Sequence, residues 1–242
     1  YCIVPYVRGR EVSRSVGEIL AEIKDLERKG VKEITLLGQN VNSYRFEGLD
    51  FASLLERILR ETSDIRWFRF VSSHPKDLSP ALIRVIAEHE RMCRHIHLPV
   101  QNGSDAVLSR MNRKYTAGQY RRLVSGLKEA VPEVSLTTDI LVGFPGETEE
   151  QFQHTFDLLA ELKLDVAHLA RYSPRTGTVS ERTLTDDVPA AEKWRRFRAL
   201  EKLQENVVRE IHAGYLGTIQ PILFEEKVKK RWKGRTPTNK LV

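Results

Sequence analysis

The chain has 242 residues, enough for one domain of about 200 residues with a small addition, or for two ordinary domains. Its composition, 40% hydrophobic and 30% charged, is typical of a soluble globular protein. No apolar run approaches the roughly 20 residues that cross a bilayer, and no export signal is recognisable. We therefore expect no membrane partner and a cytoplasmic location.

The charge balance and the cysteines restrict the function further. Lys and Arg outnumber Asp and Glu by 39 to 33, a formal net charge of +6 that suits a polyanionic partner without establishing one. The two cysteines, Cys2 and Cys93, are too few for a disulfide framework or for a metal site with three or four ligands. Because the chain opens on Tyr1 rather than Met, we expect residue 1 to be a boundary within a longer protein.

Strands and helices are predicted to alternate over the first two thirds of the chain. The predicted strands are 33–38, 66–73, 94–100, 134–142 and 165–172. The predicted helices are 16–29, 51–61, 80–89, 117–130 and 149–162. This alternation predicts an α/β fold with a parallel sheet and right-handed crossovers. Periodicity alone leaves an open doubly wound sheet and a barrel both possible.

The last third of the sequence changes character. A long charged helix is predicted over 190–212, and a strand over 219–225 then opens a small all-β module. The apolar stripe expected on that helix consists of Trp194, Phe197, Leu200, Leu203 and Val207. The chain ends too early for the module to close its own core. We therefore expect two domains, 1–212 and 213–242, each truncated at its outer end.

Polar or glycine-rich segments follow all five predicted strands. In parallel α/β folds the loops at the carboxyl ends of the strands form the active site. The segments are 38–40, 72–75, 101–104, 143–147 and 173–175. Together they predict one pocket at one edge of the sheet.

The first eleven residues, Tyr-Cys-Ile-Val-Pro-Tyr-Val-Arg-Gly-Arg-Glu, resemble the end of the cluster-binding loop in radical S-adenosylmethionine (SAM) tRNA methylthiotransferases. A lone cysteine is otherwise more often buried or incidental than a ligand. In that family three cysteines spaced C-x3-C-x2-C hold a 4Fe-4S cluster and leave one iron open for SAM. The resemblance implies that Cys2 is the third metal ligand and that Tyr1 lies near the adenine of SAM.

The resemblance extends over nearly the whole chain. Residues 36–44 are similar to the segment after the second barrel strand in the branch that modifies isopentenylated adenosine beside the anticodon. Residues 97–104 and 107–115 match the family strongly, and 138–148 match its fifth strand, which supports the adenine of SAM. Neither G-x-G-x-x-G nor the Walker pattern is present, which excludes a triphosphate loop. The implied cofactor-binding residues are Tyr1, Gly38, Gln39, Asn40, Ser73, Gln101, Ser104, Arg113, Asp139, Val142 and Gly143.

Several of these residues have more than one interpretation. Gln101 and Ser104 suit ribose hydroxyls and Arg113 suits a carboxylate, but Ser104 also suits a helix N-cap, with Asp105 at the positive helix end. Asp139 needs a partner if it is buried, and its role can be structural. His74, before a proline in a turn, is more often structural than catalytic, so no catalytic side chain is assigned.

Basic residues near the end of the chain suggest contact with RNA. Residues 227–235 mix cations with one tryptophan, and in the resembling family this region belongs to the tRNA-binding TRAM domain. The implied RNA-binding residues are Arg175, Lys229, Lys230, Arg231, Lys233 and Arg235. Cys93 is expected to be structural.

The resemblance implies a partial radical-SAM (β/α)6 TIM-like barrel followed by the start of a TRAM domain. The implied reaction adds a methylthio group to C2 of N6-isopentenyladenosine next to the tRNA anticodon, with SAM, two 4Fe-4S clusters and an electron donor. The chain alone is expected to be inactive, because most cluster ligands lie outside it. Two alternatives stay open: a methylthiotransferase acting on a ribosomal protein or on threonylcarbamoyl-adenosine tRNA, and a noncatalytic RNA-binding barrel.

Overall fold

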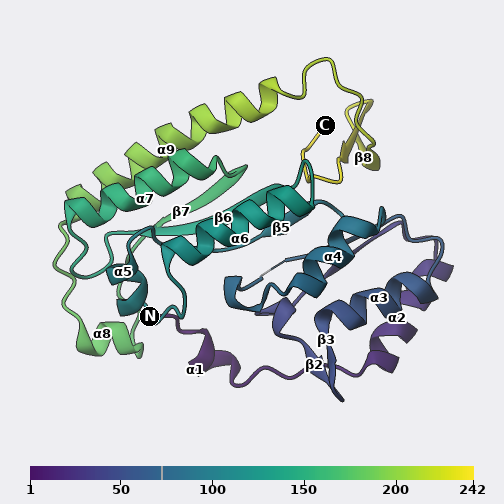
Figure 1. Ribbon diagram of the computed structural model, residues 1–242, viewed down its shortest axis with the longest axis horizontal. Coiled ribbons are helices and arrows are strands. Elements are labelled where there is room, and N and C mark those ends of the chain that lie inside the picture. The colour runs from purple at the N-terminus through teal and green to yellow at the C-terminus, as the bar shows by residue number, and fades with distance from the viewer. Residues whose placement is uncertain (72) are drawn as a thin grey trace. The chain divides into compact units, whose positions relative to one another are not determined.

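The structure is a computed structural model that describes residues 1–71 and 73–242 (Figure 1). The chain divides into two compact units, each assembled from segments that are distant in sequence. The first unit comprises residues 1–11, 98–124 and 137–216, and the second comprises 12–97, 125–136 and 217–242. Helix α6 (Ala117–Ala130) contributes residues to both.

The first unit is built on two parallel strands and two helices. Strand β6 (Ser135–Val142) pairs with β7 (Val166–Arg171), so that Val142 lies opposite Arg171. Helix α7 (Glu149–Leu162) connects the strands and begins with a capping box between Thr148 and Gln151. The long helix α9 (Ala190–Ala213) packs against β7 and α7 (Figure 1). Short helices α1 (Val4–Arg8), α5 (Asp105–Arg110) and α8 (Val179–Thr183) complete the unit.

The second unit repeats the alternation of helix and strand. Helix α2 (Val16–Arg28) leads into β1 (Glu33–Leu36), which pairs in parallel with β4 (Trp67–Phe70). Helices α3 (Phe51–Glu61) and α4 (Pro80–Glu88) follow β1 and β4, and β5 spans His95–His97. The smaller elements are the 3₁₀ helices η1 (Val41–Ser43) and η2 (Pro75–Asp77) and the hairpin of β2 (Arg45–Phe46) and β3 (Leu49–Asp50).

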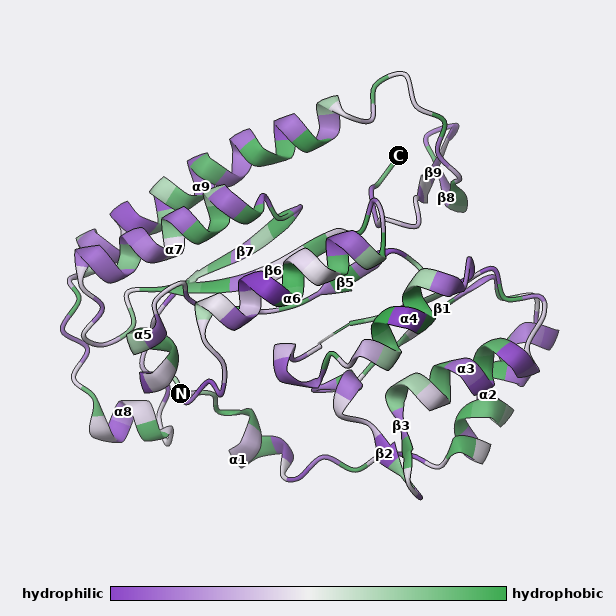
Figure 2. Ribbon diagram, viewed as in Figure 1, coloured by the Kyte–Doolittle hydropathy of each residue, from purple (hydrophilic) through white to green (hydrophobic). Residues whose placement is uncertain are grey.

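Amphipathic helices supply the core of this second unit. Figure 2 shows hydrophobic and hydrophilic residues alternating around α2 and α3. In α3 the apolar residues recur at helical spacing, and Leu55 and Ile58 are completely buried. They belong to the same buried core as Phe68 of β4. Burial of each such side chain contributes about 1.5–3 kcal/mol to folding.

A C-terminal hairpin ends the chain. Strand β8 (Leu223–Val228) pairs in antiparallel fashion with β9 (Arg231–Arg235), and the two turn residues between them, Lys229 and Lys230, have φ values of 47° and 68°. The buried Arg69 donates from Nη2 to the carbonyl of Thr236 at 2.7 Å, and from Nε to Glu33 at 2.7 Å. This guanidinium therefore links the segment after β9 to the β1–β4 pair of the same unit.

The sequence predictions of regular elements hold well. The helices predicted over 51–61, 117–130 and 149–162 have those bounds in the structure, and the α/β alternation is confirmed. Strands are shorter than predicted, and β8 begins at Leu223 rather than 219. Helices α1 and α8 and the β2–β3 hairpin were not predicted, and α5 was anticipated only as a possible helix start at Ser104.

Two further features bear on the predicted partial barrel and on the predicted stripe of α9. Among residues 1–71 and 73–242 the parallel pairs β1–β4 and β6–β7 form separate ladders, and no closed barrel is present. In α9, Leu200 and Val207 are buried as predicted, but Trp194 is 41% exposed. Its place in the interior is taken by Lys193 and Arg196. No helix within the described ranges has the length and apolar character needed to span a bilayer.

Candidate cofactor site

Tyr1, Gln101 and Arg113 form a polar cluster in the first unit. The Tyr1 hydroxyl donates to Gln101 Oε1 at 2.8 Å and accepts from Arg113 Nη2 at 2.7 Å. The ring of Tyr1 packs edge-on against Phe144, with 5.9 Å between ring centroids, and borders a buried apolar cluster. Burial raises the pKa of the Tyr1 hydroxyl, and the nearby Arg113 charge opposes that rise. A guanidinium fork beside an amide, against an aromatic wall, suits the carboxylate and hydroxyl groups of SAM.

Gln101 has a backbone conformation that few non-glycine residues adopt. Its φ is 74°, in the left-handed region. The amide of Gln101 donates to the carbonyl of Asp139 at 2.9 Å, and its own carbonyl accepts from the amide of Leu141 at 2.8 Å. These bonds to β6 fix the strained residue, and such strain concentrates at binding sites. The half-buried Asp139 thus contributes its backbone to the site.

The loop after β6 is organised by a buried carboxylate. Gly143 has a φ of 70°, which glycine adopts readily, and its amide donates to Glu147 Oε2 at 2.5 Å. Asn102 Nδ2 donates to Glu147 Oε1 at 2.7 Å, and Arg196 Nη1 donates to Oε2 at 3.0 Å. The side chains of Glu147 and Arg196 are 0% and 5% exposed. Glu147 therefore joins three segments, 101–104, 143–147 and α9.

A second buried cation on α9 supports the same loop. Lys193 Nζ donates to the carbonyl of Tyr172 at 3.2 Å and forms an ion pair with Asp186. A Cβ atom at Gly143 would overlap the Lys193 side chain, so the loop approaches the helix as closely as glycine permits. Val142, next to Gly143, is completely buried. This packing fixes the backbone that is predicted to face adenine.

Four other predicted cofactor residues, Gly38, Gln39, Asn40 and Ser73, lie in the second unit. Gly38 and Gln39 are exposed after β1, whereas Asn40 is half-buried and its Nδ2 donates to Asp77 at 2.9 Å. Ser73 is buried, and its Oγ has no hydrogen-bond partner among residues 1–71 and 73–242. The backbone of His74 is held by the Asn42 side chain, and its Nδ1 accepts from the amide of Lys76 at 3.2 Å, which favours a structural role for His74. Ser72 lies outside the described residues.

Ser104 lies at the N-cap of α5 and is buried, but its hydroxyl makes no capping hydrogen bond. Asp105 instead accepts from the amide of Ala117 at 2.7 Å, at the start of α6. Ser104 lines a groove of about 470 Å³ that is shared with Arg121 and His154. No other predicted cofactor residue lines that groove.

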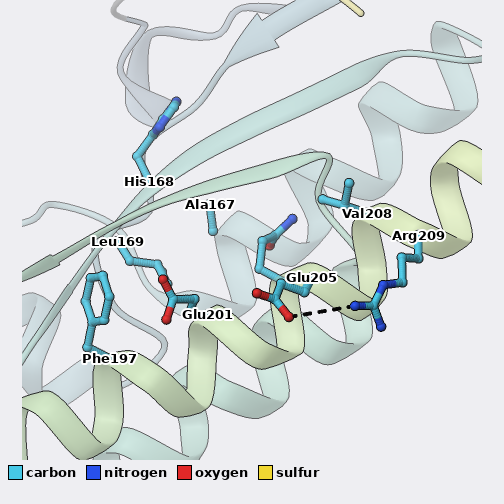
Figure 3. A pocket seen from close by; sticks show the side chains of 9 residues that line it. Ala167, His168, Leu169, Phe197, Glu201, Glu205, Val208 and Arg209 are labelled. Atoms are coloured by element: carbon cyan, nitrogen blue, oxygen red, sulfur yellow. Dashed lines mark ion pairs between the residues drawn. The ribbon is translucent and has the colours of Figure 1, made fainter.

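A larger groove, of about 680 Å³, lies between β7 and α9 (Figure 3). Ala167 and Leu169 form one side, and Phe197, Glu201 and Glu205 lie on the other. The ion pair between Arg209 and Glu205, at 4.0 Å, is at its rim (Figure 3). None of the predicted site residues lines this groove, so its size alone does not identify a cofactor site.

The predicted RNA-binding residues differ in how their charges are satisfied. Lys233 pairs with Glu226 at 2.8 Å, and Arg235 pairs with Glu225 at 3.1 Å. Lys229, Lys230 and Arg231, at the exposed tip of the β8–β9 hairpin, form no ion pair in the part of the chain that the structure describes, and the same is true of Arg175 in its exposed turn.

The cysteines give a partial fit to an iron-sulfur cluster. Cys2 is exposed, and its Sγ accepts from the amide of Val4 at 3.4 Å. Cys93 is buried, and burial raises the pKa of its thiol to about 12, so it is a poor ligand. Within residues 1–71 and 73–242 no group of three or more His, Cys, Asp or Glu side chains is placed to hold a metal ion. The described residues by themselves do not supply the ligands of an iron-sulfur cluster. Gln101 and Arg113 carry the kinds of acceptor and donor that the ribose and carboxylate of SAM would need.

Sequence reasoning missed the buried charges that hold the loops together. Glu147 lies within the predicted loop 143–147, but its partner Arg196 follows it by 49 residues. Lys193 and Arg196 are three residues apart and thus share a face of α9 with Leu200. A signal was present, because three cations at positions 193, 195 and 196 interrupt the apolar pattern at the start of that helix.

Comparisons with known proteins identify the family of the chain. The family model of the Radical SAM superfamily matches residues 1–159. A protein of Dehalococcoides mccartyi (strain CBDB1), named tRNA-2-methylthio-N(6)-dimethylallyladenosine synthase, is 45% identical over 244 residues, covering 100% of this chain and 58% of the relative. The protein of that name from Treponema denticola is 50% identical over 233 residues, covering 93% of this chain and 51% of the relative. The chain thus spans about half the length of these relatives.

A solved structure supports the fold independently of close sequence similarity. Coproporphyrinogen III oxidase from Escherichia coli, a radical SAM enzyme, matches with a TM-score of 0.55 at 18% identity, covering 86% of this chain and 50% of that one. Methylornithine synthase matches with a TM-score of 0.53 at 17% identity, covering 83% of this chain and 57% of the other. With the family model matching well over half of the residues, the chain belongs to the Radical SAM superfamily.

Proposed function

We propose that this chain is part of a methylthiotransferase that adds a methylthio group to C2 of N6-isopentenyladenosine next to the tRNA anticodon. The observation that carries the proposal is sequence identity of 45–50% to proteins named for this reaction, extending along 93–100% of the chain and hence through both units. The match to the Dehalococcoides protein covers the whole chain, so it extends beyond the segment near Cys2 to the stretches that contain Gln101 and Glu147.

The residues of the first unit have distinct parts in this proposal. Arg113 binds the carboxylate of SAM, and Gln101 accepts from a ribose hydroxyl. Tyr1 and the backbone at Val142 and Gly143 enclose the adenine. When bound, SAM supplies the methyl group and the radical that substitution at the C2–H bond of the adenine requires. Apolar side chains around Phe144 exclude water from this side of the site.

The other components of the proposed enzyme are its clusters, its electron donor and its RNA-binding module. Two 4Fe-4S clusters and an electron donor serve the intact enzyme, with Cys2 as one cluster ligand. Residues 1–212 form a radical SAM core of the partial (β/α)6 barrel type, and 213–242 form the start of a TRAM domain. The three cations at the tip of the β8–β9 hairpin, Lys229, Lys230 and Arg231, bind the anticodon stem-loop. A cytoplasmic location follows from a tRNA substrate.

The test is a reconstitution of the full-length protein without oxygen. It is supplied with SAM, a reductant, sulfide and isopentenylated tRNA, and the nucleosides are analysed by mass spectrometry. We expect a methylthio-isopentenyladenosine product. Release of 5′-deoxyadenosine without a modified nucleoside would leave the radical chemistry standing and refute the substrate.

Matched cysteine variants sharpen this experiment. Cys2→Ala should abolish both 5′-deoxyadenosine and product, because an exposed ligand is lost. Cys93→Ala should retain both, since Cys93 is buried away from any group of metal ligands in the described ranges. Equal activity of Cys2→Ala and the unmodified protein would contradict the proposed ligand.

A further inference from the structure

We propose that Arg171, Trp194 and Arg198 form an RNA-binding platform in the first unit, which binds the phosphate backbone of the substrate tRNA beside the candidate cofactor loop. This inference rests on the proposed function and adds a surface that is separate from the β8–β9 hairpin. Arg171 is the last residue of β7, and Trp194 and Arg198 lie one turn apart near the start of α9.

The three side chains are stacked at the surface. The guanidinium carbon of Arg171 lies 3.5 Å from the centroid of the Trp194 ring, and that of Arg198 lies 5.5 Å from it. Phe197 meets the indole edge-on, with 5.6 Å between centroids and an interplanar angle of 80°. Trp194 nevertheless remains 41% exposed, and both arginines are exposed. The platform is therefore held in place and still accessible.

The charges of the platform are not neutralised by the protein. In the part of the chain that the structure describes, neither Arg171 nor Arg198 forms an ion pair. Their neighbour Arg195, also exposed on α9, pairs with Glu192 at 2.6 Å and with Glu149. Carboxylates therefore lie within reach of a neighbouring arginine of α9, but they do not pair with Arg171 or Arg198 in the described part of the chain.

Stacking on an aromatic ring leaves a guanidinium able to bind an anion. Arginine carries five N–H donors in the plane of the group, and face-on contact with indole engages the π face rather than those donors. Two cations around one exposed tryptophan provide bidentate donors for phosphates, and the part of the indole that they leave exposed can contact a nucleobase. An acidic protein would be attracted by the same charges, but it offers no base to stack on Trp194, so RNA is favoured.

The position of the platform fits a substrate rather than a remote partner. Arg171 lies opposite Val142 in the β6–β7 ladder, directly before the Gly143 loop. Lys193, which precedes Trp194, packs against Gly143 and donates to the carbonyl of Tyr172, which follows Arg171. On the strand side, Arg171 pairs with Val142, the residue before Gly143. On the helix side, Trp194 follows Lys193, the residue that packs against Gly143. The platform therefore adjoins the loop that is proposed to hold SAM.

The experiment measures tRNA binding by the full-length protein over a series of salt concentrations. The double variant Arg171→Gln/Arg198→Gln removes both cations but keeps polar side chains. Loss of two phosphate contacts should reduce the slope of log K against log salt by about 1.5, which corresponds to roughly tenfold weaker binding at physiological ionic strength. Trp194→Leu should weaken binding without changing the slope, because it removes an aromatic face and no charge.

A matched control comes from the same helix. Arg209→Gln removes one exposed cation of α9 at the rim of the groove in Figure 3, where Arg209 faces Glu205 at 4.0 Å. It should leave the tRNA affinity within about twofold of that of the unmodified protein, with little change in the slope of log K against log salt. Circular dichroism and the rate of SAM cleavage without tRNA show that each variant is folded.

The outcomes separate this inference from the proposed function. Methylthio-adenosine formation by the unmodified protein, with equal tRNA affinity in the double variant and in Arg209→Gln, would overturn the platform and leave the function intact. If the double variant lost binding to the electron donor but kept its tRNA affinity, the three residues would form a protein-binding surface. That result would likewise overturn the RNA-binding platform. If the unmodified protein neither binds nor modifies tRNA, the function and the platform both fall.

Discussion

Replacing Arg196 with Met should destabilise the first unit by about 3–5 kcal/mol, because it leaves a buried carboxylate without its counter-charge. The side chain of Glu147 is 0% exposed and that of Arg196 is 5% exposed. Methionine retains most of the side-chain volume, so the effect arises chiefly from charge rather than from a cavity. After the change, the carboxylate keeps only neutral donors, from Gly143 at 2.5 Å and from Asn102 at 2.7 Å.

A double-mutant cycle isolates that charge. Glu147→Gln with Arg196→Met removes both charges, while one amide oxygen still accepts from either Gly143 or Asn102. One of those two donors then faces the NH₂ group and loses its acceptor, at a cost of about 1–3 kcal/mol. The double variant should therefore be more stable than Arg196→Met alone, with a coupling free energy of a few kcal/mol between the two sites.

The assay is urea-induced unfolding followed by circular dichroism, combined with the dissociation constant for SAM. The control is Arg195→Met, whose side chain is 49% exposed and makes surface ion pairs worth at most about 1 kcal/mol each. SAM affinity should fall with Arg196→Met, since Glu147 orders the Gly143 amide. Equal stability of the Arg195 and Arg196 variants would refute the buried network as the support of this loop.

Three further changes follow from local geometry. Gly103→Ala should destabilise the protein by about 1–3 kcal/mol in thermal unfolding, because the added Cβ would overlap the backbone of α7; unchanged stability would contradict that close contact. At pH 8, iodoacetamide should label Cys2 and spare Cys93, whose pKa is raised to about 12 by burial, as peptide mass spectrometry would show. Glu192 has its pKa lowered from 4.5 to about 2 by hydrogen bonding from Arg195, so its stabilisation is complete above pH 4.5 and is lost as pH falls towards 2. Glu192→Gln should therefore be slightly less stable than the unmodified protein at neutral pH, by under about 1 kcal/mol, and equally stable at pH 2.

Helix bounds were predictable because local signals agreed with each other. The capping box of Ser15 and Glu18 marks the start of α2, and that of Thr148 and Gln151 marks the start of α7. Apolar residues at helical spacing then continue to the observed end. Helices of five or six residues such as α1 and α5 carry too few positions for a period, and their stability comes from tertiary packing.

Three of the predicted cofactor residues lie together in the structure, but the charged groups that hold the neighbouring loops were not predicted. Resemblance selected Tyr1, Gln101 and Arg113, and the structure joins them by two hydrogen bonds. The ion pair of Glu147 and Arg196 could not be predicted, because residues 49 positions apart have no common local period. Patterns of hydrophobicity assign charged residues to solvent, so a buried pair reverses the expected face of its helix.

That reversal explains the exposure of Trp194. Lys193 and Arg196 direct one face of α9 onto the 143–147 loop, because Arg196 pairs with Glu147 of that loop and the Lys193 side chain packs against Gly143. Trp194 is then turned to an adjacent, accessible face, where it stacks with the arginines of the platform. The same buried cations that order the cofactor loop therefore determine where α9 presents its aromatic residue.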